Sequence, residues 1–238
     1  MSDSGSFAGF GPNAQRFFFE LGENNNKTWF QENRGRYEDE ILRPAERFVS
    51  SLGRELTALV PDVAFDTRRN GAGSVMRIHR DVRFSPDKSP YKLNLGVVFW
   101  VGEGRKVELP GFYFHMDAMR SFFYGGQHGI PKEALERYRT AVDAEKSGTR
   151  LEEILDDLAR RGLPIMEEPH YKRIPRGYPA DHPRARLLRY AGIGVGTEIS
   201  HDLLTSPDLI AVCLDHARRM VPLVEWFAEM NVGKFEVQ

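Results

Sequence analysis

The spacing of hydrophobic residues changes twice along the chain. Between residues 12 and 61, apolar side chains recur every three or four positions, which predicts helices. Between residues 63 and 124 they alternate with polar side chains, which is typical of strands with one buried face. Helical spacing returns after Pro131 and predicts a last long helix from about Pro207 to Met230. Blocks of helices and strands in this order are typical of α+β proteins.

Turn residues divide these blocks into individual elements. Proline suits a first helical turn, and glycine or proline often ends a helix or a strand. Earlier helices are predicted at residues 12–24, 27–41, 44–59, 131–144 and 151–161. Strands are predicted at residues 63–68, 74–80, 93–100, 106–116, 120–126 and 189–200. The first five strands follow one another closely, which favours an antiparallel meander.

One α+β domain is predicted from residue 12 to residue 238. Its central, mainly antiparallel sheet is expected to be flanked by helices from both ends of the chain, because amphipathic patterns at both ends need a surface to cover. Residues 1–11 are rich in Gly and Ser and predict a mobile lead-in. A chain of 238 residues, 41% of them apolar, is long enough to bury a sizeable core.

The alternation also sorts the polar side chains between the two faces of the predicted sheet. In residues 74–80, Met76 and Ile78 alternate with Arg77 and His79. Because side chains at i and i+2 share a face, pairing of neighbouring strands gathers one polar set. The set predicted for one face is Arg77, His79, Lys92, Asn94, Tyr113 and His115. Such a face would be cationic and rich in hydrogen-bonding groups.

Residues 77–92 hold more positive charge than their own carboxylates can neutralise. Cations that a scaffold holds together are costly unless carboxylates or a bound anion balance them. The stretch therefore predicts an anion site, most plausibly for a small molecule or group that carries phosphate, because Arg offers a planar fork to its oxygens. The predicted ligand-binding residues are Arg77, Arg83, Lys88, Tyr91, Lys92 and Tyr113.

Two other hypotheses remain open. Arg80, Asp81 and Asp87 are predicted to form structural ion pairs, and if the whole network is structural the protein is a scaffold. Alternatively, His79 or His115 acts as a general acid or base beside the bound anion. The protein would then be an enzyme on a phosphorylated small molecule or a nucleic-acid end.

Charge and composition exclude several classes of protein. A formal net charge of −1 argues against general nucleic-acid binding, which needs an excess of Lys and Arg. The sequence shows neither a leader pattern nor a long apolar run, so a cytoplasmic protein without a membrane partner is expected. A lone cysteine, Cys213, builds no thiolate metal site, and cations beside His79 and His115 would repel a metal. No nucleotide-binding fingerprint occurs, so no cofactor is expected, and the oligomeric state is not indicated.

A sequence signature runs through the charged stretch, with the form Arg-x-x-Arg-Asp-x-Arg-Phe followed by Asp-Lys-x-x-Tyr. It falls on Arg77, Arg80, Asp81, Arg83, Phe84, Asp87, Lys88 and Tyr91. This signature resembles that of a sparsely distributed bacterial family, domain of unknown function 2461. The similarity extends to Asn25, Lys27, Trp29, Phe30, Asn33, Tyr37, Gly111, Phe112, Tyr113, Pro175, Arg176, Gly177 and Pro183. The resemblance implies one intact domain of this length and carries no activity with it.

Overall fold

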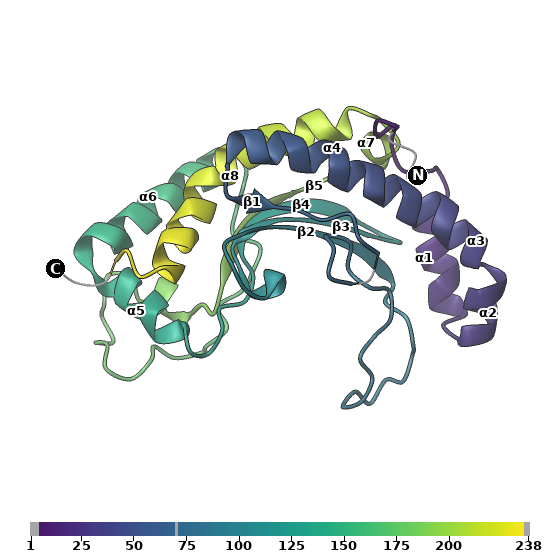
Figure 1. Cartoon of the computed structure of the whole chain (residues 1–238). Coiled ribbons are helices and arrows are strands. Elements are labelled where there is room, and N and C mark those ends of the chain that lie inside the picture. Colours follow the sequence, from purple (N-terminus) through teal and green to yellow (C-terminus); the bar gives the residue numbers. More distant parts are fainter. Residues whose placement is uncertain (1–4, 70, 236–238) are drawn as a thin grey trace. The chain divides into compact units, whose positions relative to one another are not determined.

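The computed structural model describes residues 5–69 and 71–235 of the chain. It confirms the predicted α+β class, with helices flanking a five-stranded antiparallel sheet (Figure 1). The strands, in their order across the sheet, are β1 (Val63–Ala64), β2 (Asn94–Val101), β3 (Gly111–Asp117), β4 (Ser121–Gln127) and β5 (Ile193–Glu198). The sheet order follows the chain order, as expected for a meander extended by one later strand.

Helices make up the rest of the regular structure. The longer ones are α1 (Ala14–Glu23), α4 (Arg43–Leu59), α5 (Leu135–Asp143), α6 (Glu145–Arg160) and α8 (Leu209–Asn231). The shorter segments are α2 (Lys27–Glu32), α3 (Arg34–Arg36), η1 (Tyr37–Leu42), η2 (Lys106–Glu108), η3 (Leu187–Arg189) and α7 (His201–Leu204).

The chain divides into two compact units. The first comprises Met1–Phe99, Tyr113–Phe123 and Glu198–His216, and the second Trp100–Phe112, Tyr124–Thr197 and Ala217–Gln238. The single domain expected from residue 12 to residue 238 stays a prediction.

The core of the first unit lies beneath α4 (Figure 1). Apolar residues at helical spacing give α4 one buried face, and Phe48 at its centre is fully buried. The Phe48 ring lies 6.3 Å from that of Phe99 in β2 and 4.8 Å from that of Phe114 in β3. The side of these strands that faces α4 is therefore the buried side.

Part of the predicted mobile lead-in packs on this core. Residues 1–4 lie outside the described residues, whereas Phe7 and Phe10 are buried. The Phe7 ring meets Phe48 edge-on at 5.3 Å, and the Phe10 ring stacks on Phe114 at 5.5 Å.

Strand β3 confirms the predicted alternation. Phe112, Phe114 and Met116 are almost completely buried, while Tyr113 and His115 are partly exposed. The pleat of a strand sends successive side chains to opposite faces, so the apolar residues face the core. The intervening polar residues line the other face of the strand.

The stretch between β1 and β2 departs most from the prediction. The expected strand at 74–80 is reduced to two isolated bridges, Val75 with Val97 and His79 with Tyr91. Four residue steps separate Val75 from His79, whereas six separate Tyr91 from Val97, so the opposite segment carries two extra residues. Such a bulge breaks the pairing register between the two segments.

Met76 lies before this bulge, in regular pairing, and its N–H donates to the Gly96 carbonyl at 2.9 Å. The alternation places Met76 on the face opposite Tyr113. In the structure, a Cβ built on Gly96 would lie 2.7 Å from Tyr113 Oη and 3.0 Å from Met76 Sδ. Met76 and Tyr113 are therefore neighbours, and the predicted assignment of Met76 to the other face is wrong.

Several predicted elements have other bounds, and the strand expected at 63–68 spans only Val63–Ala64. The helix expected at 27–41 is interrupted at Asn33 and continues as α3 and the π-helical segment η1 directly into α4. The strand expected at 106–116 begins only at Gly111, and the helix expected at 151–161 already begins at Glu145. A π-helical turn is rare and often marks a functional site, so η1 is the most informative of these differences.

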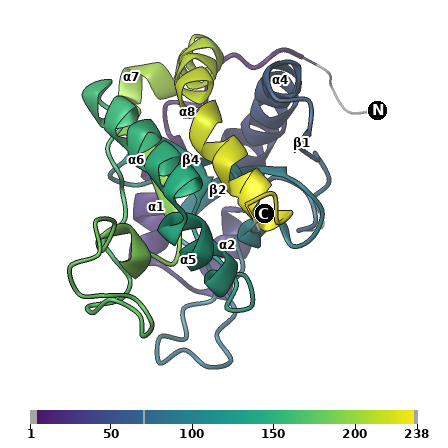
Figure 2. The ribbon, with the colours of Figure 1, turned by 90° about the vertical axis from the view of Figure 1, so that its left-hand side faces the viewer.

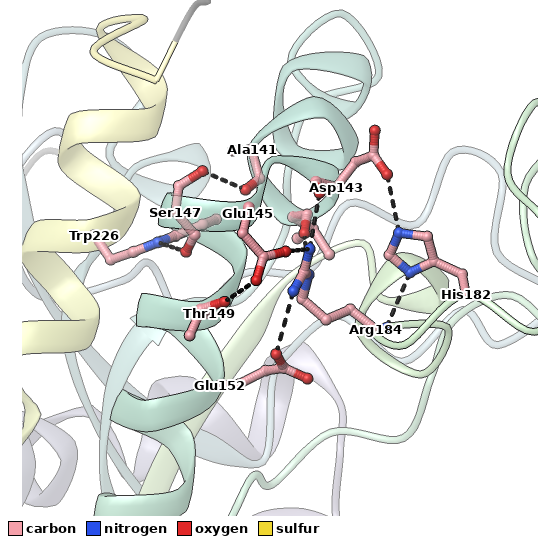
Figure 3. A network of polar contacts seen from close by, with 10 residues as sticks. Ala141, Asp143, Glu145, Ser147, Thr149, Glu152, His182, Arg184 and Trp226 are labelled. Carbon is pink, nitrogen blue, oxygen red and sulfur yellow. Dashed lines mark hydrogen bonds and ion pairs between the residues drawn. The ribbon is translucent and has the colours of Figure 1, made fainter.

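The second unit is held together at the corner between α5 and α6, which lie side by side in Figure 2. Arg184 enters this corner from the loop at 164–186, with its side chain only 5% exposed. Its guanidinium donates to the carbonyl oxygens of Val142 at 2.7 Å and Asp143 at 2.8 Å (Figure 3). Because the last carbonyls of a helix lack partners within the helix, Arg184 caps the end of α5.

Acidic and histidine side chains complete this corner (Figure 3). Arg184 forms ion pairs with Glu145 at 3.3 Å and Glu152 at 3.5 Å. The backbone N–H of Arg184 donates to His182 Nδ1, whose Nε2 lies 2.9 Å from Asp143 Oδ1. The basic, proline-rich loop is thus anchored by a buried cation.

Candidate functional site

A cavity of about 430 Å³ lies in the first unit, against η1 and the bulged stretch before β2. Its aromatic lining consists of Phe30, Tyr37, His79 and Tyr91. Its charged lining consists of Arg34, Glu38, Glu46, Arg68, Arg69 and Arg77. The cavity therefore combines an aromatic wall with more positive than negative charge.

The rings of the aromatic wall pack closely against one another. The Phe30 and Tyr91 rings stack at 4.1 Å, and the His79 ring lies 5.2 Å from Tyr91. Tyr37 packs against Phe30 at 5.3 Å, and burial raises the pKa of its hydroxyl, so Tyr37 stays neutral. This wall offers a flat apolar surface beside the charged residues.

Asn25 fixes Tyr91 at the edge of the cavity. Its side-chain amide donates to the Tyr91 carbonyl at 3.0 Å, and its carbonyl oxygen accepts from the Tyr91 N–H at 3.1 Å. One side chain thus satisfies both backbone groups of a residue 66 positions away. Asn25 and Tyr91 both belong to the sequence pattern noted above, and this clamp is a structural reason for their joint presence.

Most of the cavity's charges are paired with one another. Arg69 binds Glu46 at 2.8 Å and Glu38 at 3.1 Å. Arg34 lies 3.6 Å from Glu38, and Arg68 pairs with Asp66 outside the lining.

Arg77 is the exception. It makes no hydrogen bond or ion pair with any residue that the structure describes. Its side chain passes Gly71, where a Cβ would lie 2.5 Å from Arg77 Cδ and where the φ of 82° favours glycine. Burial and the nearby Arg77 charge lower the pKa of Lys92. Two cations that disfavour each other therefore lie close together at this edge of the cavity.

The loop of residues 80–89 is stabilised by local ion pairs. Arg80 binds Asp87, and Arg83 binds Asp81 through two bonds of 2.9 and 2.7 Å. The hydrogen bonds from Arg83 lower the pKa of Asp81 to about 2. Lys88 donates to the Val82 carbonyl at 3.0 Å. Figure 1 shows this loop, coloured between the marks for residues 75 and 100, extending away from the strands.

Three polar side chains form a hydrogen-bonded chain on the face of β3 that points away from α4. Tyr113 Oη lies 3.2 Å from His115 Nδ1, and His115 Nε2 lies 2.9 Å from Asp117 Oδ2. The His115 ring stacks on Phe122 at 4.6 Å and 10°. Burial, together with the Asp117 charge, raises the pKa of Tyr113 to about 12. At neutral pH Tyr113 is therefore a hydrogen-bond donor.

Asp117 should make the free energy of unfolding depend on pH in the acid range. Burial raises its pKa, but the hydrogen bonds from His115 and from the N–H groups of Met119 and Arg120 outweigh this and leave the pKa below its ordinary value. A lowered folded-state pKa stabilises the fold above the pKa of the unfolded state, about 3.9, and this stabilisation is lost as the pH falls through the folded-state value.

We therefore expect the free energy of unfolding of the wild type to fall more steeply below about pH 4 than that of Asp117→Asn. Urea denaturation at several pH values between about 2 and 7 measures how steeply the free energy of unfolding of each protein changes with pH. Equal slopes would show that Asp117 has the same pKa in the folded and unfolded states.

The structure separates the predicted site residues into three groups. Arg77, His79 and Tyr91 line the cavity. Tyr113 and His115 belong to the hydrogen-bonded chain, and Arg83 and Lys88 to the loop. Their roles in binding or catalysis stay predictions, as does the structural role of Arg80, Asp81 and Asp87, whose ion pairs are present.

Sequence reasoning missed several cavity residues, namely Arg34, Glu38, Glu46 and Arg69. They lie on helices or next to a turn, where charged side chains look like ordinary solvated positions. Tyr37 was placed on a predicted helix and in the family-like pattern at the start of the chain, but it was not predicted to belong to the site.

Within residues 5–69 and 71–235, no group of three or more His, Cys, Asp or Glu side chains could hold a metal ion. In the same residues, none of the helices combines the length and apolar character that crossing a membrane requires. The cytoplasmic location stays a prediction.

Fold and cavity together define an α+β protein whose cationic cavity lies against a π-helical turn. Residues 13–226 match the family described as conserved hypothetical protein DUF2461. The match covers most of the chain, so the protein belongs to this family, as the signature around residues 77–91 indicated. No curated protein and no solved structure matches the chain.

Proposed function

We propose that the protein binds an anionic small molecule that carries phosphate in the cavity lined by Arg77. The observation that carries the proposal is the exposed guanidinium of Arg77, which forms no hydrogen bond or ion pair with a described carboxylate, beside a partly buried Lys92. Holding two such cations together is unfavourable unless a counter-charge arrives. A bound anion supplies that charge.

The dimensions and lining of the cavity agree with a small ligand. A volume of about 430 Å³ falls within the range of ordinary ligand pockets. The stacked rings of Phe30 and Tyr91 give it an apolar wall, and the guanidinium of Arg77 can form two parallel bonds to phosphate or carboxylate oxygens. We therefore favour a ligand that joins an anionic group to a flat or apolar part.

The first test is a thermal-shift series with inorganic phosphate, sulfate, citrate and nucleoside monophosphates, each against sodium chloride of equal ionic strength. A ligand at about 100 times its Kd raises the free energy of unfolding by about 2.7 kcal/mol. We expect at least one anion to raise the Tm of the wild type, and Arg77→Ala to abolish the rise.

Arg43→Ala is the matched control. Arg43 carries the same charge in the same unit, but it is exposed, pairs with Asp39 at 3.0 Å and lies outside the cavity lining. Arg43→Ala should keep the full shift. The proposal is wrong if no anion raises the Tm above the salt control, or if the two variants lose the shift equally.

An enzymatic role has one specific observation in its favour, because His79 lies in the same cavity as Arg77. As a general acid or base, His79 would act on the bound anion. His79→Ala would then retain the thermal shift and lose turnover of that ligand. A loss of binding would instead make His79 a binding residue.

A further inference from the structure

The hydrogen-bonded chain of Tyr113, His115 and Asp117 is a second arrangement of reactive groups, separate from the cavity lining. Its members stand two residues apart on β3, so the pleat sends all three to the same face. Nucleophilic sites are built in this order: a hydroxyl, a base within hydrogen-bond reach, and a carboxylate that orients the base.

The partners of the His115 ring determine where its proton lies. A carboxylate only accepts hydrogen bonds, so the His115 nitrogen beside Asp117, Nε2, carries the proton. Nδ1 is then left with a lone pair that accepts from the Tyr113 hydroxyl at 3.2 Å. Asp117 is itself held by the backbone N–H groups of Met119 at 2.8 Å and Arg120 at 2.9 Å. His115 thus presents its basic nitrogen to the phenol.

We propose that Tyr113 is a nucleophile toward carboxylic esters and that His115 is its general base. As the Tyr113 oxygen bonds to the carbonyl carbon of the ester, its proton passes to His115 Nδ1, and Asp117 stabilises the resulting imidazolium. The bond from carbon to the alcohol oxygen then breaks, and the alcohol leaves with the proton from His115. Water hydrolyses the acyl-tyrosine, with His115 taking the water proton and returning it to Tyr113.

The charges around the chain favour a carboxylic over a phosphoric ester. Phosphoryl transfer relies on cations that stabilise the phosphoryl oxygens. Among the residues that the structure describes, Arg120 is the cation that forms an ion pair with this chain, at 3.7 Å from Asp117, and its guanidinium lies over the Phe122 ring at 5.5 Å. Its charge is therefore already partnered. A neutral ester needs no such cation in order to bind.

The experiment uses the full chain and p-nitrophenyl acetate, with acetylation of each tyrosine followed by peptide mass spectrometry. Tyr171, which is also partly exposed, is the internal reference. We expect Tyr113 to be acetylated about 100-fold faster than Tyr171 at neutral pH, the usual size of a general-base effect. His115→Gln, which keeps a hydrogen-bonding side chain, should remove most of this difference.

The pH profile separates a relay from simple ionisation of the phenol. With His115 as base, Tyr113 should already react quickly at neutral pH, although burial raises the pKa of its phenol to about 12. In His115→Gln the rate should rise with pH toward that value. Asp117 acts through His115 and positions it, so Asp117→Asn should shift the midpoint of the wild-type profile. The proposal is overturned if Tyr113 reacts no faster than Tyr171, or if His115→Gln leaves its rate and profile unchanged.

Discussion

Arg184→Ala is expected to lower the free energy of unfolding by about 3 kcal/mol or more, because it removes two hydrogen bonds from a buried charged donor, each worth about 1.5–3 kcal/mol. The substitution leaves the Val142 and Asp143 carbonyls at the end of α5 without their donor. It also leaves Glu152 without its cation. The guanidinium of Arg184 fits here because residue 148 is glycine, and a Cβ on Gly148 would overlap it. In Arg184→Ala the space that the guanidinium fills would remain as a cavity.

The control for Arg184→Ala is Arg160→Ala. Arg160 belongs to α6 and pairs with Asp157 at 3.5 Å, but its side chain is 70% exposed, so we expect a change within about 0.5 kcal/mol. Arg184→Lys should recover only part of the loss, because an ammonium cannot reproduce the planar fork. Urea denaturation followed by circular dichroism measures all three. Similar losses for the Arg184 and Arg160 variants would show that the buried network contributes little.

Local patterns predicted the regular parts of this fold and failed where the backbone is irregular. β3 follows the rule of alternate faces, so the common face of Tyr113 and His115 could be predicted from spacing. The stretch from Val75 to His79 keeps only two isolated bridges, because the bulge opposite it breaks the register. No local pattern reveals a bulge whose extra residues lie on the partner segment.

The candidate site is built from contacts between residues that lie far apart in the sequence, so local patterns could not predict it. Asn25 reaches Tyr91 across 66 positions, and Arg69 reaches Glu46 across 23. The sequence could rank Arg77 as a ligand-binding residue from local charge density, but not separate it from Arg83, which neutralises Asp81 two residues away. That distinction needs the three-dimensional positions of the carboxylates.

Gly194→Ala is expected to lower the free energy of unfolding by about 3 kcal/mol or more. A methyl group on Gly194 in β5 would overlap the far end of the Tyr124 ring in β4, at Cζ, Oη and Cε2. Tyr124 is buried and donates its hydroxyl to Glu167, which also accepts the Gly194 N–H at 2.9 Å. To make room, the ring would have to move and break that bond. The cost combines overpacking, about 1–3 kcal/mol, with the loss of a hydrogen bond to a charged acceptor, about 1.5–3 kcal/mol.

A double-mutant cycle identifies the Tyr124 ring as the cause. Leucine at position 124 ends before the atoms that overlap, so Gly194→Ala should cost less than about 1 kcal/mol in a Tyr124→Leu background, where the methyl group fills vacated space. Gly129→Ala is the matched control, because no atom lies within 4 Å of its added Cβ, and its change should stay within about 0.5 kcal/mol. Additive costs of the two substitutions would mean that strain elsewhere in β5, rather than the ring, explains the need for glycine.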